Sequence, residues 1–260
     1  FKVGTRNRHP WGTENRIVQF PGSFLELIAV GEGADIPPHG EGVFSFGAFV
    51  RDYLDTFEGL AMLVLESKDA LADNADFAKS GIGGFKPFFF ERKGVRPDGT
   101  PVEVSFSLAF AKNALSPCAG FFVCQQYRPE NFWNIAAQQH PNGAAGISEV
   151  MMIAENPADH AEFLSHFTGQ REMQSTSAGL SVETGRGSIS VMSEASAAFR
   201  LGAVFDPIPT RLIGFTVIVP DLRALEGRLA SGKIAYQTRS NSIVIPSNTA
   251  FGVSIAFEQA

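Results

Sequence analysis

One unit repeats along this chain and limits how it can fold: an apolar strand, a helix, and then three further strand-like segments. Its copies begin with apolar strands at 60–65, 147–154 and 212–219. The first two helices follow Ser67 and Asn156 as candidate caps, and Gly residues at 81, 169 and 232 end the three helices. The pattern predicts an α+β fold built from tandem βαβββ modules.

The first thirty residues supply only the end of such a unit. The segments "FKVGTRN", "NRIVQF" and "FLELIAV" are strand-like, but no strand and helix stand before them. By analogy with the other copies, we expect that a complete first module would have about 25–30 further residues ahead of these strands. We therefore expect three complete modules and an N-terminally truncated first one, arranged as one pair over residues 1–136 and another over 137–260. The segment "RPDGTP" predicts a turn between two strands of the second module.

Composition narrows the classes of partner. The formal net charge is −6 and the isoelectric point about 5.4, which argues against a broad basic surface for nucleic acid. No apolar run approaches the ~20 residues of a membrane span. Cys118 and Cys124 would lie roughly 20 Å apart along an extended strand, too far for a disulfide, so we expect free thiols. Free thiols are typical of a reducing compartment and favour a cytoplasmic location.

Several segments carry a family resemblance. The run "HPWGTENRIVQF" followed by "FLELIAV", together with "GVFSFGAFVRDYL" and "PENFWN", resembles glyoxalase-like domain proteins of the vicinal oxygen chelate superfamily. That superfamily includes glyoxalase I, bleomycin-resistance proteins and extradiol dioxygenases. The resemblance implies that paired modules form curved mixed sheets, two half-barrel pairs in all, each around a cavity. It also implies a small-molecule ligand. The lack of a long apolar run predicts no membrane partner, and a C-terminal pair free of ligand residues would suit a homodimer.

Metal-dependent members of the superfamily take His, Glu or Gln ligands from the first and fourth strands of paired modules. By alignment, the first-strand position falls near Met62, Glu149 and Gly214, and the fourth-strand carboxylate corresponds to Glu26. Its counterpart in the second module lies at Cys124 or Gln125. The resemblance therefore implies Glu26 and Gln125 as candidate ligands for Zn, Ni, Mn or Fe, provided that a missing first strand supplies a His.

Glu26 is the clearest single candidate because it interrupts the apolar run Phe24–Ile28, and a buried carboxylate needs a partner. Two interpretations stay open: a catalytic base or metal ligand, and a non-functional residue that either forms a structural ion pair with Arg8 or Arg16 or faces solvent by strand alternation. Polar and aromatic residues nearby in the sequence or in the linker between the pairs are candidates for substrate binding: His9, Trp11, Asn15, Gln125 and Arg128.

Two functions follow from these expectations. One is a metal-dependent lyase, isomerase or dioxygenase acting on an aromatic diol, a 2-oxo acid or a thiol adduct in the N-terminal cavity, with Glu26 as ligand or base. The other is a metal-free protein of the bleomycin-resistance type that sequesters a ligand; the 24 Phe residues and the poorly matching ligand positions favour it. Gly214 and Ala256 at ligand positions also favour a C-terminal pair that serves as scaffold or dimer interface.

Overall fold

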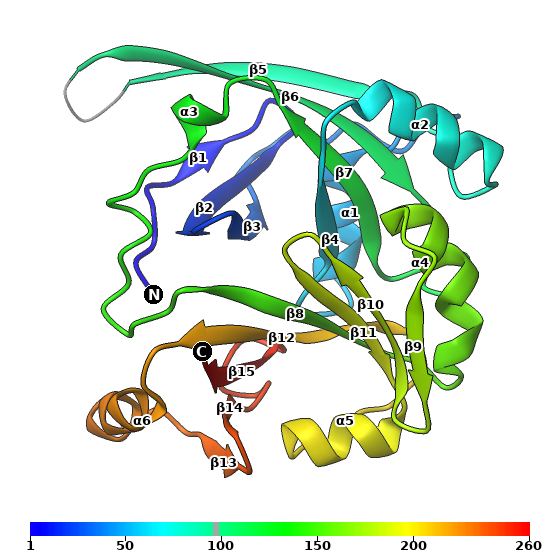
Figure 1. Cartoon of the computed structure of the whole chain (residues 1–260). Coiled ribbons are helices and arrows are strands. Elements are labelled where there is room, and N and C mark those ends of the chain that lie inside the picture. Colours follow the sequence, from blue (N-terminus) through cyan, green and yellow to red (C-terminus); the bar gives the residue numbers. More distant parts are fainter. Residues whose placement is uncertain (96–98) are drawn as a thin grey trace.

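The structure is a computed structural model that describes residues 1–95 and 99–260 (Figure 1). The predicted turn "RPDGTP" falls partly on residues 96–98 and so lies outside the described residues. The strands are β1 (Asn7–Arg8), β2 (Thr13–Phe20), β3 (Ser23–Val30), β4 (Met62–Ser67), β5 (Phe88–Val95), β6 (Pro101–Ala111), β7 (Gly120–Gln126), β8 (Gly146–Ile153), β9 (Met173–Thr176), β10 (Gly179–Thr184), β11 (Gly187–Met192), β12 (Arg211–Val219), β13 (Gln237–Arg239), β14 (Ser242–Ile245) and β15 (Ser254–Gln259). The helices are α1 (Phe46–Leu54), α2 (Ala70–Lys79), α3 (Pro129–Phe132), η1 (Pro157–His160), α4 (Ala161–Thr168), α5 (Glu194–Leu201) and α6 (Leu222–Ser231).

The predicted fold class is confirmed. Three complete βαβββ modules follow one another, the first with helix α2, the second with α4 and the third with α6, and β1–β3 form the three-stranded unit ahead of them. In each complete module the first strand pairs in parallel with the fourth, as β4 does with β7, β8 with β11 and β12 with β15. Both free cysteines are also as predicted.

The two halves of the chain differ in how their modules join. In the C-terminal half, β8 pairs antiparallel with β12, which gives one eight-stranded sheet. In the N-terminal half, β3 ends a three-stranded sheet and β4 ends a four-stranded one, so no described strand joins them.

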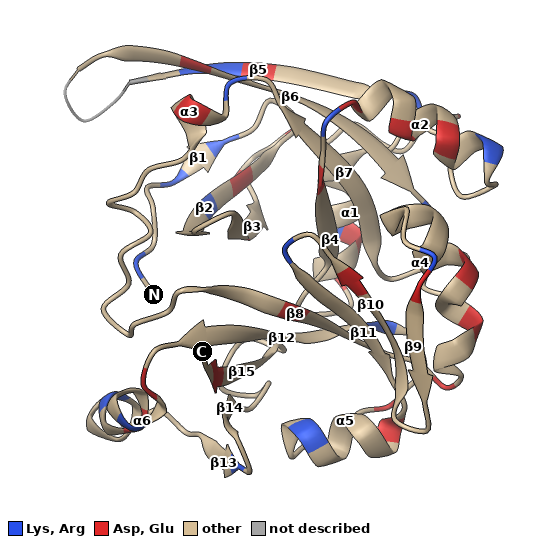
Figure 2. Ribbon diagram, in the orientation of Figure 1, with Lys and Arg blue, Asp and Glu red and all other residues tan. Residues whose placement is uncertain are grey.

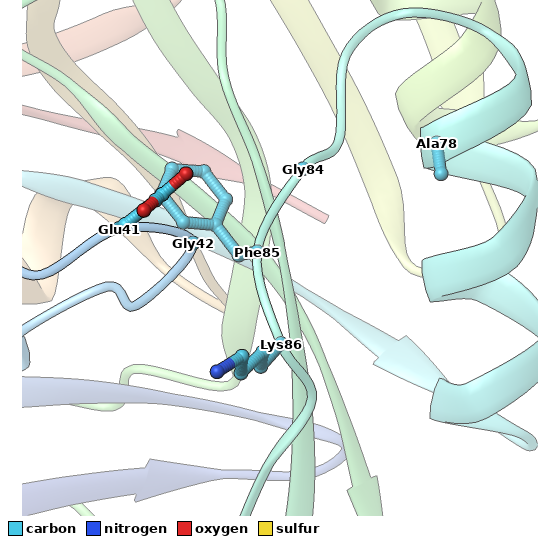
Figure 3. A pocket seen from close by; sticks show the side chains of 6 residues that line it. All are labelled: Glu41, Gly42, Ala78, Gly84, Phe85 and Lys86. Carbon is cyan, nitrogen blue, oxygen red and sulfur yellow. The ribbon is translucent and has the colours of Figure 1, made fainter.

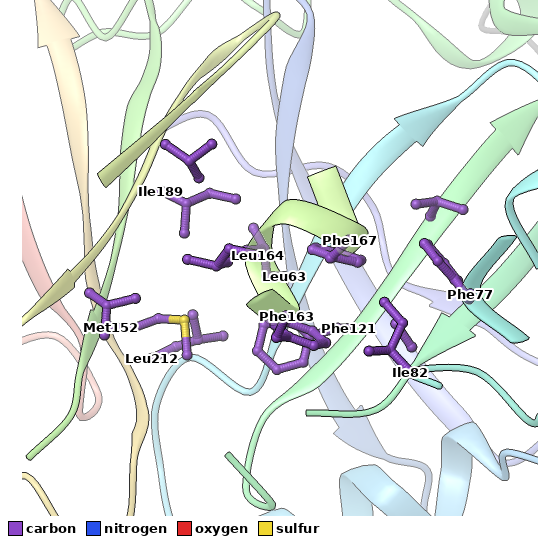
Figure 4. Close-up of a cluster of buried hydrophobic side chains, with 14 of the residues drawn as sticks. Leu63, Phe77, Ile82, Phe121, Met152, Phe163, Leu164, Phe167, Ile189 and Leu212 are labelled. Carbon is purple, nitrogen blue, oxygen red and sulfur yellow. The ribbon is translucent and has the colours of Figure 1, made fainter. Parts of the chain in front are cut away.

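Hydrophobic cores connect the halves. One cluster packs α2, and the side of β6 and β7 that α2 covers, against α4 and β8. Phe121, Phe163 and Leu164 lie at its centre (Figure 4). A second cluster packs Val18 and Phe20 of β2 against the third complete module. At the hairpin tip between β10 and β11, Arg186 donates to the Gly22 carbonyl at 2.7 Å and to Glu66 on β4 at 2.8 Å. The β2–β3 hairpin is thus held from the C-terminal half.

The sequence pattern did not predict α1 and α5, which connect the last strand of one module to the first strand of the next. Ser45 and Ser193 cap them, each by accepting a hydrogen bond from the backbone three residues on. Both helices pack on the side of their sheet that α2, α4 and α6 leave free: α1 through Phe46 and Val50, α5 through Ala197 and Leu201.

Charge is dispersed over the described part of the chain. In the view of Figure 2, basic and acidic residues are interspersed on strands and helices, without a continuous basic surface. Among the described residues, no helix is both long enough and apolar enough to cross a membrane.

Candidate functional site

The candidate site lies on what we call the inner face, the side of the sheet β4–β7 that packs on α1 and on the turn between β1 and β2. The β2–β3 hairpin reaches this face because its two-residue turn fixes its register. Pro21 and Gly22, the latter at φ 76°, suit the two central positions of a tight turn, and Phe20 pairs with Ser23. Ile17 then pairs with Glu26, which puts Glu26 diagonally across from Asn15 on the same face.

A short hydrogen-bond network holds the Glu26 carboxylate. The Asn15 side-chain amide donates to Glu26 Oε1 in a short hydrogen bond and lies 3.4 Å from His9 Nε2. Asn7 donates to Asn15 Oδ1 at 3.0 Å, and His9 Nδ1 lies 2.8 Å from Thr13 Oγ1. The contacts suit a His9 tautomer with its proton on Nδ1. His9 Nε2 then presents a lone pair 3.8 Å from Glu26 Oε1.

Burial shifts the pKa values of Glu26 and His9 in the directions that favour the neutral form of each group. Surrounding atoms raise the pKa of Glu26 above its usual value, although the Asn15 hydrogen bond and the Arg92 charge act in the opposite direction. Burial, and then the charge of Arg92, lowers the pKa of His9 to about 4. At pH 7 His9 is therefore neutral. Solvent still reaches 27% of the Glu26 side chain, so this residue lies near the edge of the buried region.

Aromatic rings fix the position of His9. The Trp11 ring stacks on the His9 ring at 4.5 Å between centroids and meets Phe88 and Phe90 edge to face at 5.3 and 4.9 Å. Phe90 stacks in turn on Phe106 at 4.9 Å. The polar group is thus bordered by an aromatic wall from β5 and β6.

Two further residues lie on this face: Arg92, which the sequence did not single out, and Cys124, which the sequence offered together with Gln125 as the counterpart of Glu26. Arg92 lies on the same side of β5 as Phe88 and Phe90, because residues two apart in a strand share a face. Cys124 lies on the inner side of β7, and burial, with the Glu26 and Glu66 charges, raises the pKa of its thiol to about 12. The available signal for Arg92 was the alternation Phe88, Phe90, Arg92, in which a charged residue follows two aromatic residues on the same face of a strand.

The structure brings Glu26, His9, Trp11 and Asn15 together and places Gln125 and Arg128 elsewhere. Gln125 lies on the opposite side of β7 from Cys124. Its side chain accepts from the Ala70 N–H at 3.1 Å and donates to the Lys68 carbonyl at 2.8 Å, which fastens the start of α2. Arg128 precedes α3 and forms a salt bridge with Glu103 at 3.2 Å.

The start of α2 also differs from the sequence prediction. Asp69, not Ser67, caps this helix by accepting hydrogen bonds from the Leu71 and Ala72 N–H groups. Ser67 instead accepts from the Asp69 N–H at 3.0 Å and donates to the side chain of Asp73.

We expect Gln125→Ala to lower the free energy of unfolding by about 1 kcal/mol, because it removes a hydrogen bond to an otherwise unpaired N–H at a helix start. Ligand binding at Glu26 should not change. Denaturant unfolding tests the first statement and calorimetric titration the second, with Gln174→Ala on exposed β9 as the matched control. Loss of ligand binding in Gln125→Ala would restore this residue to the site.

The donors on the inner face do not fit a divalent cation. Glu26 and His9 could each offer one atom, but the Asn15 amide donates into the carboxylate and Arg92 adds positive charge beside it. Gln125, the second candidate ligand, faces away. In the part of the chain that the structure describes, no three His, Cys, Asp or Glu side chains gather as a metal-binding group.

Two surface hollows lie away from Glu26. One, of about 570 Å³, is bordered by Glu41, Gly42, Ala78, Gly84, Phe85 and Lys86 (Figure 3). The other, of about 460 Å³, lies beside Lys93, Glu103 and Arg128. Neither contains a residue of the Glu26 network.

In the C-terminal half, the side of the sheet that packs on α5 contains an ion pair between Glu149 and Arg200. Glu149, on first strand β8, accepts two hydrogen bonds from the Arg200 guanidinium on α5, at 2.7 and 2.6 Å. Ser190 and Thr216 also donate to this carboxylate. Burial opposes ionisation of Glu149, but Arg200 and the two hydroxyls outweigh it and hold the pKa below its usual value. Glu149 therefore has a structural role, because it binds Arg200 and so holds α5 against the sheet.

Comparisons with known proteins agree with this architecture. The glyoxalase-like domain family matches residues 1–168, so the chain belongs to that family, whose βαβββ modules are those of the vicinal oxygen chelate superfamily. A hypothetical protein from Staphylococcus aureus has a similar fold, with 12% identity and a TM-score of 0.69 over 100% of this chain and 90% of that one. A variant of 4-hydroxymandelate synthase from Streptomyces coelicolor gives 10% identity and a TM-score of 0.52 over 95% and 80% of the two chains. A search of curated protein sequences finds no match.

Proposed function

We propose that the inner face of the N-terminal half binds a small oxygenated molecule and that Glu26 accepts a proton from it. The observation that carries this proposal is a carboxyl group with a raised pKa, on a side chain that solvent partly reaches, at the edge of an aromatic wall. A carboxylate destabilised by burial is a stronger base than one in water, and such groups concentrate at functional sites.

The neighbouring residues divide the remaining tasks. Asn15 directs its amide at Glu26 Oε1 and so orients the carboxylate. Neutral His9 presents Nε2 as an acceptor next to the same oxygen. Phe88 and Phe90, which are only partly buried, provide apolar surface for a ring or a branched chain, and Trp11 and Phe106 pack behind them. Aromatic diols, 2-oxo acids and thiol adducts all carry a proton on, or activated by, oxygen, so each class suits this arrangement.

A metal-free protein that sequesters a ligand is the second candidate. The aromatic wall and the poor fit of the donors to a cation support it. In this alternative the same face binds the molecule and Glu26 only accepts a hydrogen bond, without removing a proton.

A thermal-shift screen followed by deuterium exchange separates the two candidates. We expect a member of the three compound classes to raise the melting temperature at pH 7, since a ligand at 100 times its Kd adds about 2.7 kcal/mol of stability. Added Zn²⁺, Ni²⁺, Mn²⁺ or Fe²⁺ should leave the melting temperature unchanged. Proton NMR in D₂O then shows whether the bound compound exchanges a carbon-bound proton.

The outcomes are distinct. For a 2-oxo acid or a thiol adduct, stabilisation with exchange supports the enzyme, and stabilisation without exchange supports the binding protein; a diol, whose acidic protons are on oxygen, tests binding alone. If none of the three classes raises the melting temperature, both candidates are contradicted. A rise with one of the four cations would contradict the interpretation of the donor set.

A further inference from the structure

The chain contains two carboxylate–arginine pairs on corresponding faces, and they differ in one respect. In the C-terminal half, Arg200 contacts Glu149 directly through two hydrogen bonds of 2.7 and 2.6 Å. In the N-terminal half, Arg92 influences Glu26 and His9 through its charge, but no described residue forms a salt bridge or hydrogen bond with its guanidinium. Arg200 is thus bonded directly to Glu149, whereas Arg92 forms no direct bond with Glu26.

An arginine that served only as counter-ion to Glu26 would be expected to contact it, as Arg200 contacts Glu149. Arg92 is half-buried beside Phe88 and Phe90, where an unpaired guanidinium has lost part of its hydration. Burial accordingly lowers its pKa, although Glu26 acts in the opposite direction. A bound group that brings two acceptor oxygens would satisfy the planar fork of this side chain.

The surroundings define what else that group must carry. From Arg92, the aromatic wall runs through Phe90 to Trp11, which stacks on His9, and His9 Nε2 lies 3.8 Å from Glu26 Oε1. A molecule with its anionic end at Arg92 would lay its apolar part on Phe88 and Phe90, the partly buried rings of this wall, and bring its far end toward Glu26. Neutral diols would leave the guanidinium without a partner.

We propose that Arg92 is the anion-binding residue of this face and that the ligand is a small aromatic carboxylate, held through its carboxylate by the guanidinium. This inference rests on the proposed function and selects among its compound classes: it favours oxo acids and other organic acids over neutral diols. Arg92 thereby determines specificity, and Glu26 acts on the part of the molecule that the carboxylate positions.

Matched acids and amides test the proposal without any variant. The probes are benzoate, phenylacetate and 3-phenylpropanoate with benzamide, phenylacetamide and 3-phenylpropanamide, titrated calorimetrically into the full chain at pH 7. We expect at least one acid to bind about tenfold more tightly than its amide, the size of one charge-assisted hydrogen-bond pair. Equal affinities for every acid and its amide would overturn the role of Arg92 while leaving the proposed function intact.

Variants assign the preference to Arg92. Arg92→Gln should abolish the acid–amide difference and leave amide affinity unchanged, and Arg92→Lys should retain part of the difference, because the charge remains without the planar fork. Arg128→Gln, a change at a surface arginine paired with Glu103, should retain the difference in full. A preference that persists in Arg92→Gln would overturn the proposal. If no acid and no amide binds at all, this inference is overturned, whereas the proposed function fails only when none of its three compound classes raises the melting temperature.

Discussion

Changing Glu26 to glutamine is expected to make the protein more stable at pH 7 and to abolish proton exchange by the bound ligand. Glutamine has nearly the shape of glutamate and its Oε1 can still accept the Asn15 hydrogen bond. It carries no charge, so the burial that raises the Glu26 pKa no longer opposes folding. We expect a gain of about 1 kcal/mol, typical of substitutions that relieve a strained functional site.

The pH dependence fixes the sign of this effect. Because the folded-state pKa of Glu26 is raised, its favourable contribution is fully present below the unfolded value of 4.5 and is lost as pH rises through the folded value. The two proteins should therefore melt at similar temperatures near pH 4, and the variant should gain an advantage toward pH 7. Differential scanning calorimetry at several pH values measures it. An unchanged or lower melting temperature at pH 7 would show that Glu26 is a structural residue.

Loss of the base should lower the rate of deuterium exchange by at least about 100-fold, the lower limit for general acid–base catalysis. Glu14→Gln is the matched control on the same hairpin. Glu14 forms salt bridges with Arg6 and Arg8 at 3.2 and 2.7 Å, so its replacement should decrease stability slightly and leave exchange unchanged. If Glu26→Gln retained full exchange, the proton acceptor would have to be another group.

The part of the site that a sequence can predict is the part carried by one hairpin. The turn at Pro21–Gly22 fixes which residues pair, and strand alternation then places Asn15 and Glu26 on one face. The repeat of strand, helix and three strands is equally local, which is why the module order follows from the pattern. In both cases the information lies within a few residues along the chain.

Which residues of β7 face the inner side of the sheet could not be predicted in the same way. The run "GFFVC" is buried on both sides, one toward α2 and α4 and the other toward the aromatic wall, so hydrophobic alternation is missing. A shift of one residue exchanges Cys124 for Gln125, and only the packing of the whole sheet decides between them. Arg92 depends likewise on how β5 approaches a hairpin more than sixty residues earlier in the chain.

The helix α5 shows a further limit. Its sequence "EASAAFRL" carries local helix signals, namely a cap at Ser193, helix-favouring Ala and Leu residues and Gly202 after its end, but the repeating pattern of strand, helix and three strands includes no helix at this place. The helix is stabilised by Ala197 and Leu201 on the C-terminal sheet and by the Arg200–Glu149 ion pair, whose members are 51 residues apart. Glu149 therefore has a structural partner that its strand gives no reason to expect.

Removing Arg200 is expected to destabilise the protein strongly. Arg200→Met leaves the Glu149 carboxylate, whose side chain is only 12% exposed, with two hydroxyl donors and no counter-ion. Breaking a buried ion pair from one side costs about 3–5 kcal/mol; because the Arg200 side chain is 37% exposed, we expect about 2–4 kcal/mol. The melting temperature should fall by about 5–10 °C.

The double variant Glu149→Gln/Arg200→Met tests the cause. It removes both charges, so most of the lost stability should return, and Arg223→Met on the exposed side of α6 should change stability by less than about 0.5 kcal/mol. A double variant as unstable as Arg200→Met would mean that the arginine stem, not the ion pair, stabilises α5.

The pH dependence of stability provides an independent test of the Arg200–Glu149 ion pair. In the native protein the lowered Glu149 pKa contributes stability that is present above the unfolded value of 4.5 and is lost as pH falls through the folded value. Without Arg200, burial acts on this carboxyl with less opposition, which moves its pKa upward. The destabilisation of Arg200→Met should consequently be largest near pH 7 and should shrink as the pH approaches 4. Because Arg200 closes the C-terminal face and the Glu26 network lies on the other half, the folded variant should bind ligand with unchanged affinity.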